Sequence, residues 1–286
     1  MSILFKIKFH TKEAIGRCFN AAGFQIKRKQ KIGTLSAPKS SNFNEEAIIS
    51  DLLAKIQPKE HFYIDIGAGD GESMSNSFPL VNAGWKGLAV EGGGMPFAKL
   101  AHRYAEFPRV HLAREWVTPD SVLNLLAGYG TPKEFGFLSL DIDGYDYFVL
   151  DKILSAYRPS LICTEINERI PPPLQFTVKY SPDLEWQGGP FYSQSISILE
   201  ELAKKYKYSL VKLEYNNAFL IPSEISPLPA ITAEEAYKIG YVDKPNRLVF
   251  MPANKEFDPA ITMSKDQAVA FFKEKFKAYD GKYILR

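Results

Sequence analysis

The sequence predicts an α/β fold built on a doubly wound, mostly parallel sheet with helices on both faces. Two observations predict it. From residue 43 onward, short apolar runs alternate with segments whose apolar residues recur at helical spacing. The first apolar run also leads directly into a glycine-rich turn, as expected of a buried parallel strand that connects to a helix. Alternation of this kind is typical of a sheet wound in both directions.

Five strands and five helices are expected in the first part of this pattern. The helix at 44–56 follows from Ile48, Ile49, Leu52 and Leu53, which recur at helical spacing. Each strand is a short run rich in apolar residues, and these runs lie at 62–66, 87–91, 109–113, 137–141 and 160–165. The helices that connect them are expected at 73–83, 97–104, 119–126 and 147–156.

The last third of the chain predicts further elements outside this alternation. We expect an amphipathic helix at 193–205, closing strands at 208–213 and 218–221, and outer helices at 232–239 and 264–277. The chain then divides into a basic N-terminal extension at 1–40 with a short helix at 14–22, an α/β domain at 41–222, and a C-terminal helical extension at 223–286 packed on that domain.

The composition is that of a globular protein. The chain has 286 residues, of which 45% are hydrophobic and 24% charged, and these values exclude a fibrous or disordered chain. No apolar run approaches the ~18 residues of a membrane span. The first residues place charges where a signal peptide is apolar, so export by that route is not expected. The chain has two cysteines, Cys18 and Cys163, which are too few for disulfide bonds to stabilise a fold of this size. They favour a reducing, cytoplasmic compartment.

Charge is distributed unevenly along the chain. Residues 1–40 hold nine Lys or Arg and a single acid, Glu13, which gives +8, and the other 246 residues carry −6. A basic segment beside an acidic body predicts weak contact with an anionic membrane surface, peripheral to its inner face; a solvated extension is the simpler alternative. The acidic domain has no basic stripe with interleaved aromatics, so nucleic-acid binding is not expected.

The turn after the first strand is the most informative segment. It reads Asp65-Ile-Gly67-Ala-Gly69-Asp70-Gly71, and glycines at such a turn let a ligand approach the backbone. A dinucleotide-binding loop would have Gly at position 72, where this chain has Glu. Acids at 65, 70 and 72 would repel a pyrophosphate and suit a ligand with an amino group and no phosphate. S-adenosylmethionine is such a ligand.

These residues resemble motif I of class I S-adenosylmethionine-dependent methyltransferases, which have a Rossmann-like sheet. The resemblance implies that Asp65 lies near the methionine ammonium and that Gly67, Gly69 and Gly71 line the cofactor. Glu91 ends the second expected strand, where a carboxylate can accept both ribose hydroxyl hydrogens. A purely structural loop and a solvated acid are the alternatives.

A second acidic cluster is predicted where the fourth and fifth strands end. Asp141 and Asp143 follow the fourth strand, and Glu165 and Asn167 end the fifth. Ligands of open α/β sheets bind at the carboxyl ends of the strands, so these side chains are candidate catalytic residues. A carboxylate there can act as a general base toward a hydroxyl. Alternatively, Asp141, Asp143 and Glu165 hold Mg²⁺, or the Asp side chains cap the next helix.

The segments Leu140–Tyr147 and Glu165–Asn167, with the helix at 193–205 and Asn217–Phe219, resemble FkbM-type methyltransferases over about residues 60–221. That resemblance implies an O-methyltransferase acting on a sugar, glycan or related natural product. Sugar O-methyltransferases with a comparable strand end use Mg²⁺ with paired acids on the next strand, where this chain has Glu-Ile-Asn.

Other chemistries find little support in the sequence. Histidine and cysteine spacing predicts no zinc site, and Ser73, Ser75 and Ser77 lack a nucleophile elbow. The aromatic segment at 176–192 predicts either a lid over the acceptor or a loop packed on the core. The alternative functions are a non-catalytic cofactor-binding or interaction domain in a biosynthetic complex, and a methyltransferase that acts on an amino or lipid group.

Overall fold

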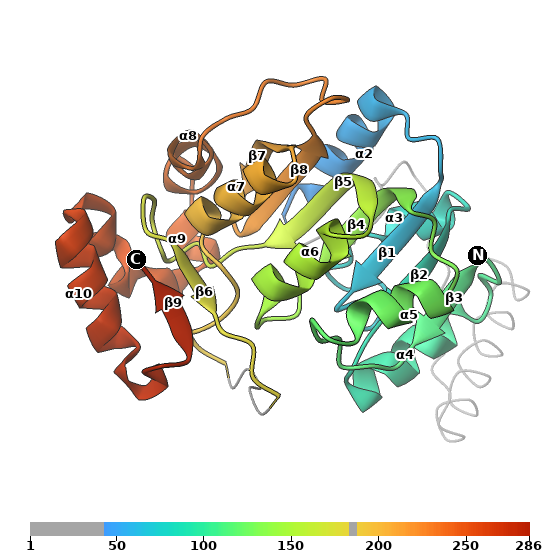
Figure 1. Ribbon diagram of the computed structural model, residues 1–286, viewed down its shortest axis with the longest axis horizontal. Coiled ribbons are helices and arrows are strands. Elements are labelled where there is room, and N and C mark those ends of the chain that lie inside the picture. The colour runs from blue at the N-terminus through green and yellow to red at the C-terminus, as the bar shows by residue number, and fades with distance from the viewer. Residues whose placement is uncertain (1–42, 183–187) are drawn as a thin grey trace, which may run out of the picture. The chain divides into compact units, whose positions relative to one another are not determined.

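A seven-stranded sheet forms the centre of the protein, with strand order β3-β2-β1-β4-β5-β8-β7 (Figure 1). The computed structural model describes residues 43–182 and 188–286. The first five strands in chain order are mutually parallel, β8 runs antiparallel to β5, and β7 runs antiparallel to β8. The predicted doubly wound, mostly parallel sheet is therefore confirmed. The predicted helix at 14–22 and the extension at 1–40 lie outside the described residues.

The ends of the strands and helices of this layer lie within three residues of the expected ones, except at the beginning of α3. The strands are β1 (Phe62–Ile66), β2 (Lys86–Val90), β3 (Val110–Ala113), β4 (Glu134–Leu140), β5 (Arg158–Glu165), β7 (Tyr208–Glu214) and β8 (Asn217–Pro222). The helices are α2 (Glu45–Ile56), α3 (Phe78–Asn82), α4 (Gly94–Tyr104), α5 (Val122–Gly128), α6 (Asp146–Leu154) and α7 (Ile196–Lys205).

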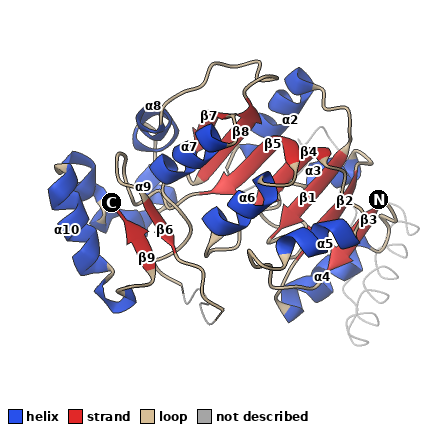
Figure 2. Ribbon diagram, in the orientation of Figure 1, coloured by secondary structure: helices blue, strands red, loops and turns tan. Residues whose placement is uncertain are grey.

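Helices cover both faces of the sheet, as Figure 2 shows. Alternate residues of a strand point to opposite faces, so Ile64 of β1 belongs to one core cluster and Tyr63 to the other. The first cluster holds the apolar residues of α5, α6 and α7, and the second holds those of α2, α3 and α4. The sheet therefore separates two apolar cores, one on each of its faces.

The helix expected at 73–83 is wrong at its beginning. Residues 67–77 form turns, and α3 begins only at Phe78. Asp70 explains the difference, because its side chain accepts the backbone N–H groups of Glu72 at 3.0 Å and Ser73 at 2.7 Å. An Asp side chain that bonds the backbone two and three residues later favours a turn over a helix.

The C-terminal stretch contains more than helices. The expected helices correspond to α8 (Ala233–Tyr237), continued by a π-helical turn at Lys238–Val242, and to α10 (Lys265–Lys275). Between and after them lie α9 (Arg247–Phe250) and 3₁₀ turns at Pro252–Glu256, Asp258–Thr262 and Lys277–Tyr279. The chain ends in β9 (Tyr283–Leu285), which pairs antiparallel with β6 (Phe176–Val178) in a second, small sheet.

A third apolar core holds this second sheet against α10. Its fully buried centre consists of Phe176, Phe272 and Phe276. The predicted boundary at residue 222 stays a prediction. Among the described residues, no helix has the length and apolar character that crossing a membrane requires.

Candidate active site

A cavity of about 750 Å³ opens at the carboxyl ends of β1, β2 and β4. Ligands of open α/β sheets bind at this edge. The strand ends and their loops supply most of the wall, and a separate part comes from residues beyond β5. Its polar and charged lining consists of Asp65, Ser73, Ser75, Asn76, Glu91, Glu115, Thr118, Ser139, Asp141, Asp143, Tyr145 and Tyr279.

Gly67 lies in the turn that follows β1 and lines this cavity. Its φ is +88°, and a Cβ atom at this position would lie 1.7 Å from the carbonyl oxygen of Asp141. No other residue fits without moving the backbone of the β4 end. The N–H groups of Gly67 and Ala68 both donate to the Val90 carbonyl at 3.0 Å, so the turn ties β1 to β2.

Gly69 and Gly71 have different surroundings. Gly69 has a φ of +58° and open space where a Cβ would be, and it lines the cavity. Gly71 has a φ of +81°, but its Cβ would lie 2.5 Å from Leu100 and 2.9 Å from Tyr104 of α4. Gly71 does not line the cavity. Its place in the structure is a packing contact with α4 rather than the ligand contact expected from the motif.

Asp65 is buried at the base of the cavity, and only 4% of it is exposed. The Ser77 hydroxyl donates to its carboxylate, and Ser139 on the neighbouring strand is a second partner. Burial raises the pKa of Asp65 to about 6, while the two serine hydrogen bonds oppose that rise.

Glu91 connects two backbone segments at the end of β2. Its Oε2 accepts the N–H of Gly69 at 2.9 Å, and its Oε1 accepts the N–H of Gly93 at 2.6 Å. Each carboxylate oxygen has a further lone pair, so Glu91 can hold the glycine turn and still accept a hydrogen bond from a ligand in the cavity.

The other two acids of the motif have structural partners. Asp70 builds the turn described above, and Glu72 forms an ion pair with Arg103 of α4. Neither residue lines the cavity. Of the three acids of the motif, Asp65 alone lines the cavity, and the repulsion of a pyrophosphate by all three stays a prediction.

Asp141, Asp143 and Glu165 come together, as the sequence predicts. Carboxylate oxygens of the three residues all lie within 4.8 Å of one another. Asp141 and Asp143 line the cavity, and Glu165 lies beside them as a buried residue. Asp143 reaches this position with a φ of +54°, which is the left-handed conformation that Asp tolerates better than most residues.

The pKa values of this cluster shift in one direction. Burial, and then the charges of Asp143, Asp146 and Asp65, raise the pKa of Asp141 well above its usual value. Burial and the charge of Asp141 do the same to the pKa of Glu165. Glu165 is buried, whereas Asp141 and Asp143 are half-buried. Carboxylates this close together favour the uptake of a proton or a cation over full ionisation.

Glu165 has an unused oxygen at this point. Its Oε1 accepts the amide of Asn216 at 3.0 Å, whereas Oε2 is buried without a hydrogen-bond partner among the described residues. Oxygen ligands of this kind suit Mg²⁺. The donor set of Asp141, Asp143 and Glu165 thus fits a divalent cation.

Asp146 and Asn167 have structural roles. Asp146 accepts the N–H groups of Ile142 and Gly144, each at 3.0 Å, and so shapes the loop that carries Asp143. Asn167 is fully buried and donates to the carbonyls of Pro190 and Tyr192, at 2.8 and 3.1 Å. It does not line the cavity. The structure therefore separates Asn167 from the other predicted catalytic residues, because its amide is committed to the loop at 190–192.

Several cavity residues were not expected from the sequence. Glu115 and Trp116 follow β3, and Trp116 remains 67% exposed. A Cβ on Gly92 would lie 2.4 Å from the Trp116 ring, so the absence of a side chain at Gly92 makes room for this indole. The rule that sites lie at carboxyl strand ends, applied to β3, would have found both residues. Nothing in the sequence pattern brings Tyr279, from the C-terminal stretch, to the same cavity.

In the described part of the chain, all charged residues that line the cavity are acidic. Five acidic residues line it, namely Asp65, Glu91, Glu115, Asp141 and Asp143. No Lys, Arg or His is among its lining residues in the described part of the chain. Such a site attracts cations and repels phosphates.

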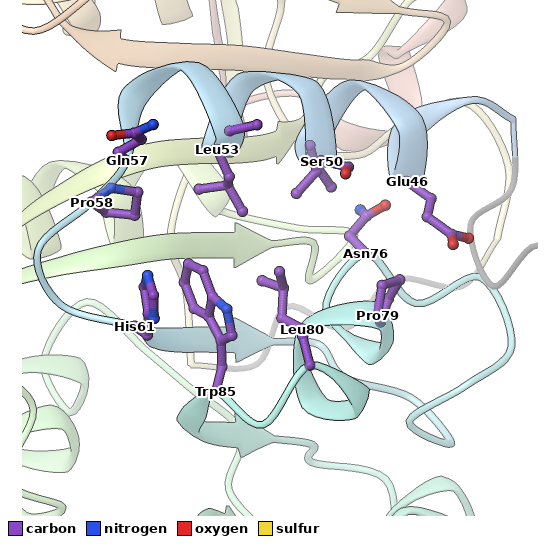
Figure 3. Close-up of a pocket in the computed structure, with 13 residues that line it drawn as sticks. Glu46, Ser50, Leu53, Gln57, Pro58, His61, Asn76, Pro79, Leu80 and Trp85 are labelled. Atoms are coloured by element: carbon purple, nitrogen blue, oxygen red, sulfur yellow. The ribbon is translucent and has the colours of Figure 1, made fainter.

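A second hollow of about 620 Å³ lies between α2 and α3 (Figure 3). Its floor carries His61 and Trp85, which precede β1 and β2 and stack with ring centroids 4.8 Å apart. Most of the remaining lining is apolar, from Ile49, Leu53 and Leu80. The hollow lacks the clustered acids and glycines of the larger cavity, which is therefore the better candidate for chemistry.

Comparisons with known proteins find similarity only in structure. The sequence matches no model of a known protein family and no curated protein. A putative O-methyltransferase from Klebsiella pneumoniae is 16% identical, with a TM-score of 0.42 over 73% of this chain and 87% of that one. Magnesium protoporphyrin IX methyltransferase from Synechocystis PCC 6803, with bound S-adenosylmethionine, is 13% identical, with a TM-score of 0.39 over 73% and 94%. At identities this low, the likeness assigns no substrate or reaction.

Proposed function

We propose that this protein is an S-adenosylmethionine-dependent O-methyltransferase that acts on a hydroxyl group of a sugar, glycan or related natural product. The observation that carries the proposal is the cavity at the carboxyl ends of the strands, which five acidic residues and no basic residue line in the described part of the chain. S-adenosylmethionine brings a sulfonium and an ammonium group and no phosphate. A dinucleotide would bring its pyrophosphate into a field of carboxylates.

The cofactor would bind along β1 and β2. Asp65 would lie near the ammonium group, Gly67 and Gly69 would leave room for the methionine part, and Glu91 would accept the ribose hydroxyl hydrogens. The exposed Trp116 indole offers a flat apolar face for the adenine ring. Gly71 would support this site through α4 rather than touch the cofactor.

The acceptor hydroxyl would meet the acidic cluster. A carboxylate, which we assign to Asp141, takes the hydroxyl proton as the oxygen bonds to the methyl carbon. The bond between that carbon and sulfur breaks, sulfur keeps the electron pair, and S-adenosylhomocysteine leaves. Alternatively, Asp141, Asp143 and Glu165 would hold Mg²⁺, which would lower the pKa of the hydroxyl.

Two other functions are alternatives to this one. A non-catalytic cofactor-binding or interaction domain would bind S-adenosylmethionine, or have lost it, without turnover. A methyltransferase acting on an amino or lipid group would use the same cofactor site with another acceptor. Formation of S-adenosylhomocysteine with hydroxyl, amino and lipid acceptors in turn separates these functions.

The Glu91→Ala variant is expected to bind S-adenosylmethionine about 10- to 100-fold more weakly, a loss of about 1–3 kcal/mol, because the ribose and the Gly69 N–H lose a charged acceptor. Isothermal titration calorimetry measures the affinity. Glu72→Ala is the matched control, since Glu72 is an acid of the same loop that pairs with Arg103 outside the cavity. Equal affinity in the folded Glu91→Ala variant and the parent would remove Glu91 from the site.

The basic segment at 1–40 suggests a cytoplasmic protein that is peripheral to the inner face of the membrane. We expect the full-length protein to bind vesicles of anionic lipid at low salt and to lose that binding at high salt. Deletion of residues 1–40 should abolish the binding and leave turnover unchanged. Absence of binding by the full-length protein at low salt would reject the membrane contact and leave a solvated extension.

A further inference from the structure

The wall of the cavity beyond β5 differs in character from the cofactor side. It is formed by Val178, Pro182, Phe191 and Tyr279, which come from β6 and from loops near the second sheet. In Figure 1, β6 and β9 lie at the opposite end of the molecule from β2 and β3. In the strand order, β4, which Asp141 and Asp143 follow, lies next to β5, whereas β3, which Glu115 and Trp116 follow, is the far edge strand.

The central feature of this wall is a stacked pair of rings. Phe191 and Tyr279 lie parallel, with centroids 4.0 Å apart and an angle of 4° between their planes. Phe191 is buried and packs edge-on against Phe176 and Phe276 of the third core. Tyr279 is half-buried, and its hydroxyl has no hydrogen-bond partner among the described residues. The pair is a flat, fixed surface with one polar group available.

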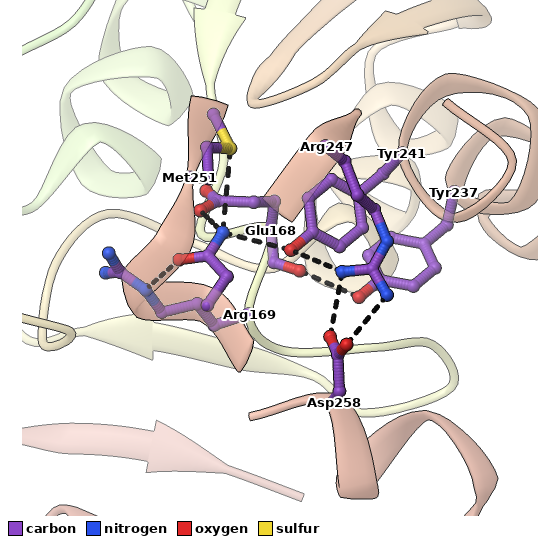
Figure 4. A network of polar contacts seen from close by, with 8 residues as sticks. Glu168, Arg169, Tyr237, Tyr241, Arg247, Met251 and Asp258 are labelled. Carbon is purple, nitrogen blue, oxygen red and sulfur yellow. Dashed lines mark hydrogen bonds and ion pairs between the residues drawn. The ribbon is translucent and has the colours of Figure 1, made fainter. Parts of the chain in front are cut away.

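A polar network joins residues 237–258 of the C-terminal stretch to the residues that follow β5 (Figure 4). Glu168, three residues beyond the end of β5, accepts the Tyr192 hydroxyl at 2.6 Å and the Asn254 amide at 2.5 Å. Arg247 forms a two-point ion pair with Asp258, at 2.8 and 2.9 Å. The segment that carries Tyr279 is itself held by the pairing of β9 with β6 and by its packing on the third core.

We propose that Tyr279, stacked on Phe191, binds the methyl acceptor and that this acceptor contains a six-membered ring with one apolar face and adjacent hydroxyl groups. The inference rests on the proposed function. The acidic cluster suits the hydroxyl edge of such a ring, and an aromatic surface packs against its apolar face. A pyranose and a catechol share this chemistry, whereas a linear polyol offers no flat face. The C-terminal stretch is then the part of the chain that selects the acceptor.

The test measures binding of four probes to the full-length protein saturated with S-adenosylhomocysteine. Two, called ring diols because they carry adjacent hydroxyl groups on a six-membered ring, are methyl α-glucopyranoside and catechol. Two are controls, linear sorbitol and cyclohexanol. We expect one ring diol to bind measurably at about 10 mM or below and at least tenfold more tightly than either control. Tyr279→Ala should weaken that binding about tenfold and leave S-adenosylhomocysteine binding unchanged. Tyr279→Phe should retain most of the affinity.

Tyr283→Ala is the matched control. Tyr283 belongs to the same core and contacts Phe191 and Phe276, but it does not line the cavity. The Tyr283→Ala variant should have a lower melting temperature but the same affinity for the ring diol. Equal weakening in both variants, or sorbitol binding as tightly as the ring diols, would overturn the inference. If S-adenosylhomocysteine binds and no ring diol does, only this inference fails; if S-adenosylhomocysteine does not bind, the proposed function fails with it.

Discussion

Replacement of Asp141 by Asn is expected to slow methyl transfer about 100-fold or more and to leave S-adenosylmethionine binding nearly unchanged. The substitution keeps the shape of the side chain and removes the charge that accepts the hydroxyl proton, and a lost general base costs ~10²–10⁴-fold in rate. Asp141 lines the cavity beside Asp143 and Glu165. The rate is measured as S-adenosylhomocysteine formed in single turnovers with saturating cofactor.

The pH dependence of the methyl-transfer rate is a second measurement that tests this prediction. Burial and neighbouring carboxylates raise the pKa of Asp141 well above its usual value. The base works only when it is ionised, so the parent rate should rise with pH across the region of that raised pKa and then level off. Asp141→Asn should abolish this rise. Asp146 serves as a contrast, because Asp146→Asn disturbs the loop hydrogen bonds to Ile142 and Gly144 and should lower stability as well as rate.

Treatment with EDTA distinguishes the two roles that the cluster can have. Loss of activity with EDTA and its return with Mg²⁺ would indicate that the carboxylates act through a metal. Unchanged activity would indicate a direct carboxylate base. If Asp141→Asn, Asp143→Asn and Glu165→Gln all turn over the acceptor at the parent rate, the cluster is not the catalytic centre.

The sequence predicts the sheet because its signals are local. The apolar composition of the runs at 62–66 and 137–141 by itself indicates buried strands, and both runs correspond to strands of the structure. The gathering of Asp141, Asp143 and Glu165 also follows from sequence, since the carboxyl ends of adjacent parallel strands share one edge.

What the sequence does not predict depends on contacts between distant segments. Asn167 sits two residues beyond Glu165, where alternation along a strand suggests the same orientation. The strand ends at Glu165, however, and the Asn167 amide turns to the carbonyls of Pro190 and Tyr192. Tyr279 reaches the cavity only because β9 pairs with β6, a contact between segments about 100 residues apart.

Replacement of Gly67 by Ala is expected to abolish S-adenosylmethionine binding, with a loss of about 100-fold or more in affinity. A Cβ at this position would lie 1.7 Å from the Asp141 carbonyl oxygen, and the backbone has a φ of +88°. Both the turn and the β4 end must move to relieve the overlap, and backbone strain of this kind costs about 1–3 kcal/mol. The shift displaces the cofactor loop and Asp141 together, so turnover should be lost as well.

Two glycines of the same chain separate the causes of this effect. Gly130 has a φ of +66° and open space around a would-be Cβ, and it lies outside the cavity. Gly130→Ala should therefore lose only about 1 kcal/mol of stability, from backbone strain alone, and keep its affinity. Gly69→Ala also meets no protein atom, so weaker binding there would reflect contact with the cofactor itself. If folded Gly67→Ala binds S-adenosylmethionine as tightly as Gly130→Ala does, the glycine turn does not form the cofactor site.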